Sequence, residues 1–368
     1  MDRSLLDPGG DASPPLRIAI VPPLHESVPP RFYGGTERVV SYLTEELVRL
    51  GHDVTLFATA DSATSARLKP MARQGLRLDP DCRDPLAHHV SMVHDVLELA
   101  HAFDVVHFHL DYLHFPAVRE AGLRSLTTLH GRLDIPDLFP LYRRYPDMRL
   151  VSISEAQRRP MPWASWIGTV PHGLPRDLLP LGQGRGGYLA FLGRISPEKR
   201  PDRAIRIARR LGMKLLVAAK IEKTDLAYFE SVVRPMLGGP GVEFVGEIGE
   251  REKAAFLGEA AALLFPIDWP EPFGLVMIEA MSCGTPVLAF DCGSVREVVT
   301  PGASGWIVAS EDEAVAALAG LDALDRAACR RAFEERFTAE RMARDYLRLY
   351  RRVCLLPRRT PSVRRAAA

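Results

Sequence analysis

The sequence contains no apolar run approaching the ~18 to 20 residues that are needed to span a bilayer. Its first residues carry Asp2, Asp7 and Asp11 and lack the apolar core of a signal peptide. Only five cysteines are present, and none stands in a CxxC pair, which argues against a zinc site and against a disulfide framework. These absences predict a protein of the reducing cytoplasm.

Aromatic residues make up only 8% of the chain, and no basic patch is interleaved with them, so nucleic acid is not an expected partner. The net charge is +1, but from Phe337 to Ala368 nine arginines stand against Glu340 and Asp345, a local net charge of +7. This basic end fits a solvated last helix with a frayed tail. The alternative is peripheral contact with an anionic membrane at its inner face.

The composition is typical of a globular protein, and the length of the chain is sufficient for two domains. The chain has 368 residues, of which 47% are hydrophobic and 25% are charged. Short β-branched runs alternate with helical patterns, which is typical of a parallel sheet covered by helices on both faces. Helices are expected at Thr36 to Leu50 and Pro201 to Leu211. Strands are expected at Arg17 to Val21, Asp53 to Ala58, Asp104 to His109, Ser125 to Leu129, Arg149 to Ile153, Tyr188 to Leu192, Lys214 to Ala218, Val242 to Val245, Ala262 to Phe265, Pro286 to Phe290 and Trp306 to Val308.

A glycine-rich segment, Gly182 to Gly187, separates two such series of strands and helices. Two series joined in this way predict an α/β protein with two doubly wound, Rossmann-like domains. Ligands of such sheets bind outside the carboxyl ends of the strands, so the site is expected in a cleft between the domains. The expected parts are a flexible segment 1–16, an N-terminal domain 17–181, a C-terminal domain 182–336, a helix 337–356 and a basic tail 357–368.

The most informative segment, WPEPFGLVMIEAMSCGTPV, runs from Trp269 to Val287. Pro272 suits the first turn of a helix, and Phe273 to Ser282 suits its body. Glu271 then lies where a strand meets the start of a helix, and Glu279 lies roughly 9 Å further along the axis. Two carboxylates so placed are acceptors for pairs of hydroxyl groups, as in dinucleotide sites.

Free backbone N–H groups are expected at the start of that helix, on Phe273, Gly274 and Leu275. A helix amino terminus of this kind binds phosphate and other anions. A second segment, FLGRISPEK, ends a strand with two cations, Arg194 and Lys199. Two cations at a strand end suit a departing diphosphate that is held without a metal ion.

Four histidines stand in three motifs of the first domain. His130 ends the strand in TTLHG, and His172 lies in VPHGL just before the linker. His107 and His109, in HFHLD, are interpreted as packing groups at a strand end. A metal site built from His107, His109 and Asp111 is the alternative.

These motifs together resemble the large retaining glycosyltransferase family 4, the glycosyl transferases group 1, which includes sucrose and glycogen synthases and bacterial mannosyltransferases. The match includes the acidic pair Glu271 and Glu279, the Pro-Phe-Gly, the Glu-Ala-Met and the Gly-Thr-Pro. The glycine loop YGGTE, with Gly35, follows the first strand as it does in that family. His172 replaces the asparagine that the family has there, so no role carries over to it.

The resemblance covers about residues 17 to 355 and implies a GT-B fold, in which two Rossmann-like domains face each other across a cleft. The N-terminal domain would take the acceptor and the C-terminal domain a nucleoside diphosphate sugar, and the last helix would cross back to the first domain. The implied reaction is transfer of a hexosyl unit with retention, without a metal or other cofactor. His130 and Glu271 would shape the sugar site as catalytic residues. Donor-binding residues would be Gly35, Arg194, Lys199, Phe273, Gly274, Leu275 and Glu279.

Two other functions remain open on the sequence. One is a GT-B sugar-nucleotide epimerase, and the other is a catalytically silent nucleotide-sugar-binding protein. A nicotinamide-dependent dehydrogenase is not expected, because neither domain opens with GxGxxG. The sugar, the base, the acceptor and the oligomeric state are not indicated by the sequence.

Overall fold

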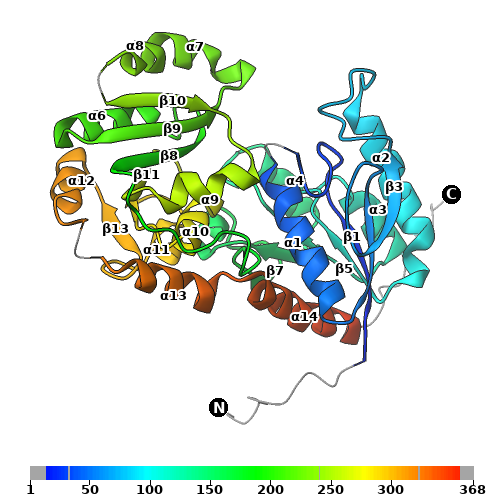
Figure 1. The fold of residues 1–368 in the computed structure, drawn as a ribbon. Coiled ribbons are helices and arrows are strands. Elements are labelled where there is room, and N and C mark those ends of the chain that lie inside the picture. The colour runs from blue at the N-terminus through cyan, green and yellow to red at the C-terminus, as the bar shows by residue number, and fades with distance from the viewer. Residues whose placement is uncertain (1–13, 32–33, 240, 322–323, 357–368) are drawn as a thin grey trace.

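The computed structural model describes residues 14–31, 34–239, 241–321 and 324–356. They form two α/β units side by side, each built on one parallel sheet (Figure 1). Two Rossmann-like domains, as the sequence predicts, are confirmed by this architecture. Among the described helices, none has both the length and the apolar character to cross a membrane.

The N-terminal domain has a seven-stranded sheet in the order β3-β2-β1-β4-β5-β6-β7. Every neighbouring pair is parallel, and the central strand β1 is buried from Ile18 to Val21. Strands β2 and β3 extend the sheet on one side of β1, and strands β4 to β7 extend it on the other. Such a switch point places a ligand crevice at the carboxyl end of β1. The elements are β1 (Arg17–Val21), α1 (Gly35–Arg49), β2 (Asp53–Thr59), β3 (Arg67–Ala72), α2 (Pro85–Leu99), η1 (Ala100–Ala102), β4 (Val105–Phe108), α3 (Phe115–Ala121), β5 (Ser125–Thr128), α4 (Leu138–Arg144), β6 (Leu150–Ser152), α5 (Glu155–Arg158) and β7 (Trp166–Thr169).

The C-terminal domain repeats this plan with a six-stranded parallel sheet, in the order β10-β9-β8-β11-β12-β13. Its switch point lies beside β8, the strand that ends at Arg194. The elements are β8 (Tyr188–Arg194), α6 (Pro201–Leu211), β9 (Lys214–Lys220), η2 (Lys223–Asp225), α7 (Leu226–Tyr228), η3 (Phe229–Val233), α8 (Arg234–Leu237), β10 (Val242–Gly246), α9 (Glu250–Gly258), β11 (Ala262–Phe265), α10 (Leu275–Ser282), β12 (Val287–Phe290), α11 (Val295–Val298), β13 (Gly305–Val308), α12 (Glu311–Leu318) and α13 (Arg326–Arg336).

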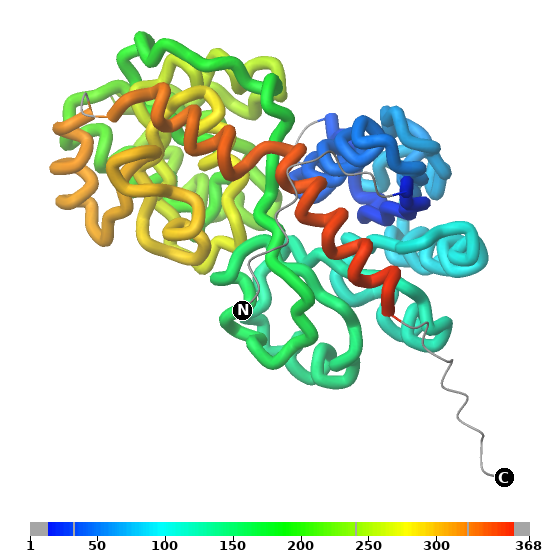
Figure 2. The backbone as a smooth tube through the Cα atoms, turned by 90° about the horizontal axis from the view of Figure 1, so that it is seen from below, coloured from blue at the N-terminus to red at the C-terminus, as the bar shows by residue number. Residues whose placement is uncertain are grey.

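The last helix, α14 (Ala339–Leu355), leaves the C-terminal domain and packs against α1 and β4 of the first domain. Figure 2 shows α13 and α14 running in line from one domain to the other. Tyr346 and Tyr350 of α14 are fully buried. Their hydroxyl groups lie 2.9 Å from Oγ1 of Thr128 and 2.8 Å from Nδ1 of His107. The helix is thus part of the hydrophobic core of the N-terminal domain.

The prediction of a helix over Phe273 to Ser282 is wrong at its start, because α10 begins two residues later, at Leu275. Gly274 caps the helix with φ 79°, a left-handed conformation that a residue with a side chain rarely adopts. A Cβ at this position would also lie 2.8 Å from Cε of Met277. Phe273 and Gly274 therefore belong to the loop before the helix.

Candidate functional site

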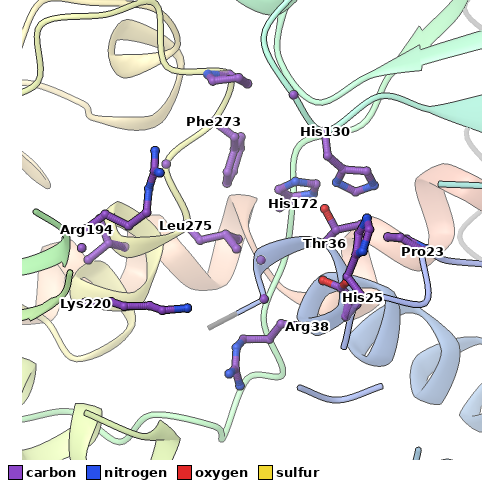
Figure 3. Close-up of a pocket in the computed structure, with 18 of the residues that line it drawn as sticks. Pro23, His25, Thr36, Arg38, His130, His172, Arg194, Lys220, Phe273 and Leu275 are labelled. Carbon is purple, nitrogen blue, oxygen red and sulfur yellow. The ribbon is translucent and has the colours of Figure 1, made fainter. Parts of the chain in front are cut away.

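A cavity of about 980 Å³ lies between the two domains, at the carboxyl ends of both sheets. Figure 3 shows Arg194 and Lys220 of the C-terminal domain on one side of it, and Pro23 and His25 of the N-terminal domain on the other. All nine site residues named from the sequence line this one cavity: His130, Glu271, Gly35, Arg194, Lys199, Phe273, Gly274, Leu275 and Glu279.

Glu271 is held in the loop after β11 by two neighbours that share one of its oxygens. Its Oε2 accepts a hydrogen bond from the Lys199 ammonium and, at 3.0 Å, another from Nε1 of Trp269. The Lys199 Nζ also lies 5.0 Å from the centre of the Trp269 ring, within the range of a cation–π contact. The carboxylate and the ammonium are both largely buried, so the pair is poorly screened by water.

Glu279 has a similar partner, which the sequence did not indicate. The Nζ of Lys253, on α9, donates to Oε1 of Glu279 at 2.6 Å. The two side chains are 13% and 5% exposed, and both residues line the cavity. Each carboxylate of the acidic motif therefore faces the cavity with a lysine already bound to it.

Arg194, at the end of β8, is held by two carboxylates beside the cavity. Its Nη2 donates to Glu198 at 2.8 Å, and its Nη1 lies 3.6 Å from Asp225. Its Nε is buried and makes no hydrogen bond in the structure. The guanidinium lines the cavity wall while these two carboxylates hold its position.

Two helix amino termini meet at this cavity. Helix α1 begins at Gly35 and α10 begins at Leu275, and both residues line the wall. A Cβ at Gly35 would lie 3.7 Å from Cδ1 of Leu275, so the glycine loop lies directly against the start of α10. Because the positive ends of two helix dipoles converge here, the place favours an anion.

His130 is partly buried and lies in a row with the buried His109 and His172. Its Nε2 lies 2.8 Å from Nδ1 of His109, and its ring stacks on His172 at a centroid distance of 5.2 Å. The ring of His172 in turn makes a T-shaped contact with the ring of Phe273, with 4.9 Å between the ring centroids. His172 was given no role from the sequence, and its contacts across the cleft could not have been read from its motif.

The metal alternative at His107, His109 and Asp111 is not supported by the geometry. His107 uses both ring nitrogens, with Nδ1 bonded to Tyr350 and Nε2 bonded to Oγ1 of Thr128 at 2.7 Å. A ligand nitrogen must offer a free lone pair, which leaves His107 unsuitable. Over the described part of the chain, no group of three or more candidate metal ligands comes together.

The hydrogen bonds of His109 determine where the proton of His130 lies. The Nε2 of His109 is buried without a partner, and an N–H left unpaired there costs more than an unused lone pair. The proton of neutral His109 is therefore placed on Nδ1, from which it is donated to Nε2 of His130. Neutral His130 must then carry its own proton on Nδ1.

We expect nitrogen-15 NMR of labelled protein to show His130 neutral and protonated on Nδ1 between about pH 5 and 8. The physical reason for neutrality is burial, which lowers the pKa of His130 to about 3. The His109→Asn variant, whose amide can replace the donating Nδ1–H, should keep the proton of His130 on Nδ1. In His109→Leu nothing donates to Nε2, so the proton of His130 should no longer be restricted to Nδ1. A proton on Nε2 in the wild type, or titration near 6.5, would contradict the assignment.

Comparison with known proteins gives matches over both domains. Residues 183–337 match the family model described as glycosyl transferases group 1, and residues 33–177 match that of glycosyltransferase family 4. The chain belongs to the group 1 glycosyltransferases. The fold and the family inferred from the acidic motif are thereby confirmed.

The matches to named relatives cover either part or most of this chain. It is 39% identical over 139 residues to a D-inositol 3-phosphate glycosyltransferase of Mycolicibacterium paratuberculosis, a match covering 36% of this chain and 31% of that protein. The match thus spans less than a third of that relative. A glycogen synthase of Mycobacterium tuberculosis is 26% identical over 375 residues, covering 86% of this chain and 89% of that protein.

A solved structure extends the likeness to nearly the whole chain. AviGT4, a glycosyltransferase involved in avilamycin A biosynthesis, has a TM-score of 0.71 and 26% identity, covering 92% of this chain and 98% of that one. Anabaena HepE, solved in complex with UDP and glucose, shares the fold with a TM-score of 0.69 at 16% identity and covers 92% of this chain and 100% of its own.

Proposed function

We propose that this group 1 glycosyltransferase transfers a hexosyl unit from a nucleoside diphosphate sugar to a hydroxyl acceptor, with retention and without a metal ion. The observation that carries the proposal is the pairing of two buried carboxylates with two lysines beside converging helix termini. Such a cavity offers acceptors for hydroxyl groups and positive charge for a diphosphate in one place. HepE, whose structure contains UDP, supports a nucleotide in this fold.

The proposed roles follow the wall of the cavity. Glu279 accepts the ribose hydroxyls, while Glu271 and the Nδ1–H of His130 contact the sugar. Arg194 and Lys199, with the amides at the start of α10, receive the charge of the leaving diphosphate. Lys199 binds Glu271 in the structure, so donor binding must divide this ammonium between the carboxylate and the phosphate.

The N-terminal domain is proposed to bind the acceptor. The acceptor substrate is a glycan, a lipid-linked sugar or a small molecule. Contact with an anionic membrane through the basic end stays a proposal, since the tail 357–368 lies outside the described residues. Arg341 is not part of that free charge, because it pairs with Asp345 at 2.7 Å and donates to the carbonyls of Pro171 and His172.

The test is a donor screen with the full-length protein, followed by product analysis. We expect one of the UDP-, GDP- or ADP-hexoses to raise the melting temperature and to be turned over in excess EDTA. Proton NMR should show the anomeric configuration of the donor in the product. Loss of turnover in EDTA with recovery in magnesium, or an inverted product, would overturn the mechanism. Donor binding without transfer would favour a silent binding protein, and a converted donor sugar would favour an epimerase.

A further inference from the structure

The N-terminal wall of the cavity holds carboxylates and neutral groups but no uncommitted cation among the described residues. Its carboxylates at the cavity surface are Glu37, Asp84 and Asp111. Its cations are Arg38 and Arg77, and both are bound to glutamates. The charge of this wall decides which acceptors can approach it.

Arg77 is committed to a buried partner. Its Nη1 donates at 2.9 Å to Oε1 of Glu26, a residue that is only 3% exposed. The other oxygen of Glu26 is already buried without a hydrogen bond. The charge of Arg77 is therefore balanced within the protein by Glu26, and moving the guanidinium off Glu26 would leave that buried carboxylate unpaired.

Arg38 is committed across the cleft. It forms an ion pair with Glu250 at the start of α9 in the C-terminal domain. On the C-terminal wall of the cavity, Nζ of Lys220 lies 3.0 Å from Oε1 of Glu222. Arg194 and Lys199 are assigned above to the donor diphosphate, so they are not available to an acceptor bound at the same time.

The histidines of this wall add no positive charge at neutral pH. Partial desolvation, together with the nearby His89 and Arg77, lowers the pKa of His25 to about 4, and desolvation lowers the pKa of His130 to about 3. Burial also raises the pKa of Glu37 to about 7, so Glu37 adds further negative charge only as the pH rises. Asp111 follows β4 with its backbone in a left-handed conformation, φ 48°.

The same wall offers the contacts that a sugar ring or polyol needs. Tyr112 and Leu86 line it with 42% and 57% of their surface exposed, and aromatic and apolar faces pack on the C–H faces of such rings. His172 also lines the cavity, and its Nδ1 is buried without a hydrogen-bond partner. Carboxylates and imidazoles pair well with hydroxyl groups.

Resting on the proposed function, we propose that the acceptor is an uncharged hydroxyl compound, such as an unphosphorylated glycoside or polyol, and not a phosphate ester. A phosphate placed on this wall would face Asp84 and Asp111, while each described arginine of the wall already has its charge balanced by a glutamate. The relatives named D-inositol 3-phosphate glycosyltransferases make the phosphorylated acceptor the natural comparison.

The test uses matched pairs of compounds that differ by one phosphate: methyl glucoside with its 6-phosphate, and inositol with D-inositol 3-phosphate. Saturation-transfer NMR on the full-length protein measures binding of each member without any donor sugar, but with the nucleoside diphosphate from the donor screen present so that Arg194 and Lys199 are occupied. We expect the unphosphorylated member of at least one pair to bind at least about ten-fold more tightly. Equal or tighter binding of the phosphorylated members, or binding of neither member of both pairs, would overturn the proposal.

Variants locate the effect at this wall. Asn can replace Asp at a helix N-cap and in a left-handed conformation, so Asp84→Asn and Asp111→Asn remove charge while keeping the local fold. Together they should raise the ratio of phosphorylated to unphosphorylated binding several-fold, and Asp137→Asn, before α4 and away from the cavity, should not. An unchanged ratio in the double variant would contradict the role of these carboxylates. Because binding is read without any donor sugar, failure of sugar transfer is a separate result that bears on the proposed function alone.

Discussion

Replacing Lys199 with alanine is expected to lower kcat by roughly a hundred- to a thousand-fold, the typical effect of removing one preorganised charge from a transition state. The diphosphate gains negative charge as it leaves, and Lys199 is one of two cations at strand ends that can meet it. The substitution also leaves Glu271, which is 8% exposed, without its ammonium partner. Steady-state kinetics with the donor identified by the screen gives the measurement.

A matched control separates this role from general loss of charge. Lys214 in the same domain pairs with Glu243 at 2.7 Å, but both side chains are about half exposed and lie outside the cavity. Lys214→Ala should keep kcat close to that of the wild type, since surface ion pairs contribute little. Arg194→Lys should also lose turnover, because an ammonium cannot reproduce the fork of a guanidinium. A fully active Lys199→Ala enzyme would remove Lys199 from the proposed mechanism.

Replacing Glu279 with alanine is expected to weaken donor binding by about 1.5 to 3 kcal/mol, or roughly ten- to 150-fold, because a charged hydrogen-bond acceptor for the ribose is lost. The change also leaves Lys253 buried without its partner. Calorimetry with the nucleoside diphosphate alone is the measurement, since the ribose contact does not need the sugar.

A double-mutant cycle distinguishes the ribose contact from the lysine pair. Lys253→Met removes the ammonium but keeps the carboxylate of Glu279, so donor affinity should fall less than in Glu279→Ala. The double variant should show coupling between the two positions, as contacting residues do. Normal circular dichroism with unchanged donor affinity in Glu279→Ala would count against the ribose assignment.

The buried elements of the fold could be predicted from the sequence because their apolar runs are continuous. Strand β1 lies at Arg17–Val21 and β11 at Ala262–Phe265, with the predicted bounds. Two edge strands were missed. Strand β3, RLKPMA, has no buried residue. It also contains Pro70, which lacks an N–H group and is tolerated in an edge strand, where that position can face solvent and need not bond a neighbouring strand. Strand β7, WIGT, is only half buried, so its pattern does not stand out.

The site was predictable where chemistry is concentrated in short motifs, as in the segment around Glu271. Lys253 could not be found in this way. It lies 26 positions before Glu279 on an otherwise ordinary helix, and only the packing of α9 beside α10 brings the two together. The tautomer of His130 depends likewise on His109, a residue of the neighbouring strand end.

The path of α14 has a consequence for the order in which the protein can be made. Synthesis completes the strands of the N-terminal domain first, and domains generally fold as they emerge. Here Tyr346 and Tyr350, which bond Thr128 and His107 inside that domain, come from the last helix to leave the ribosome. The nascent first domain therefore carries an open apolar groove and unpaired polar groups until the second domain has been translated. A chain interrupted before Ala339 would present that groove to chaperones and proteases.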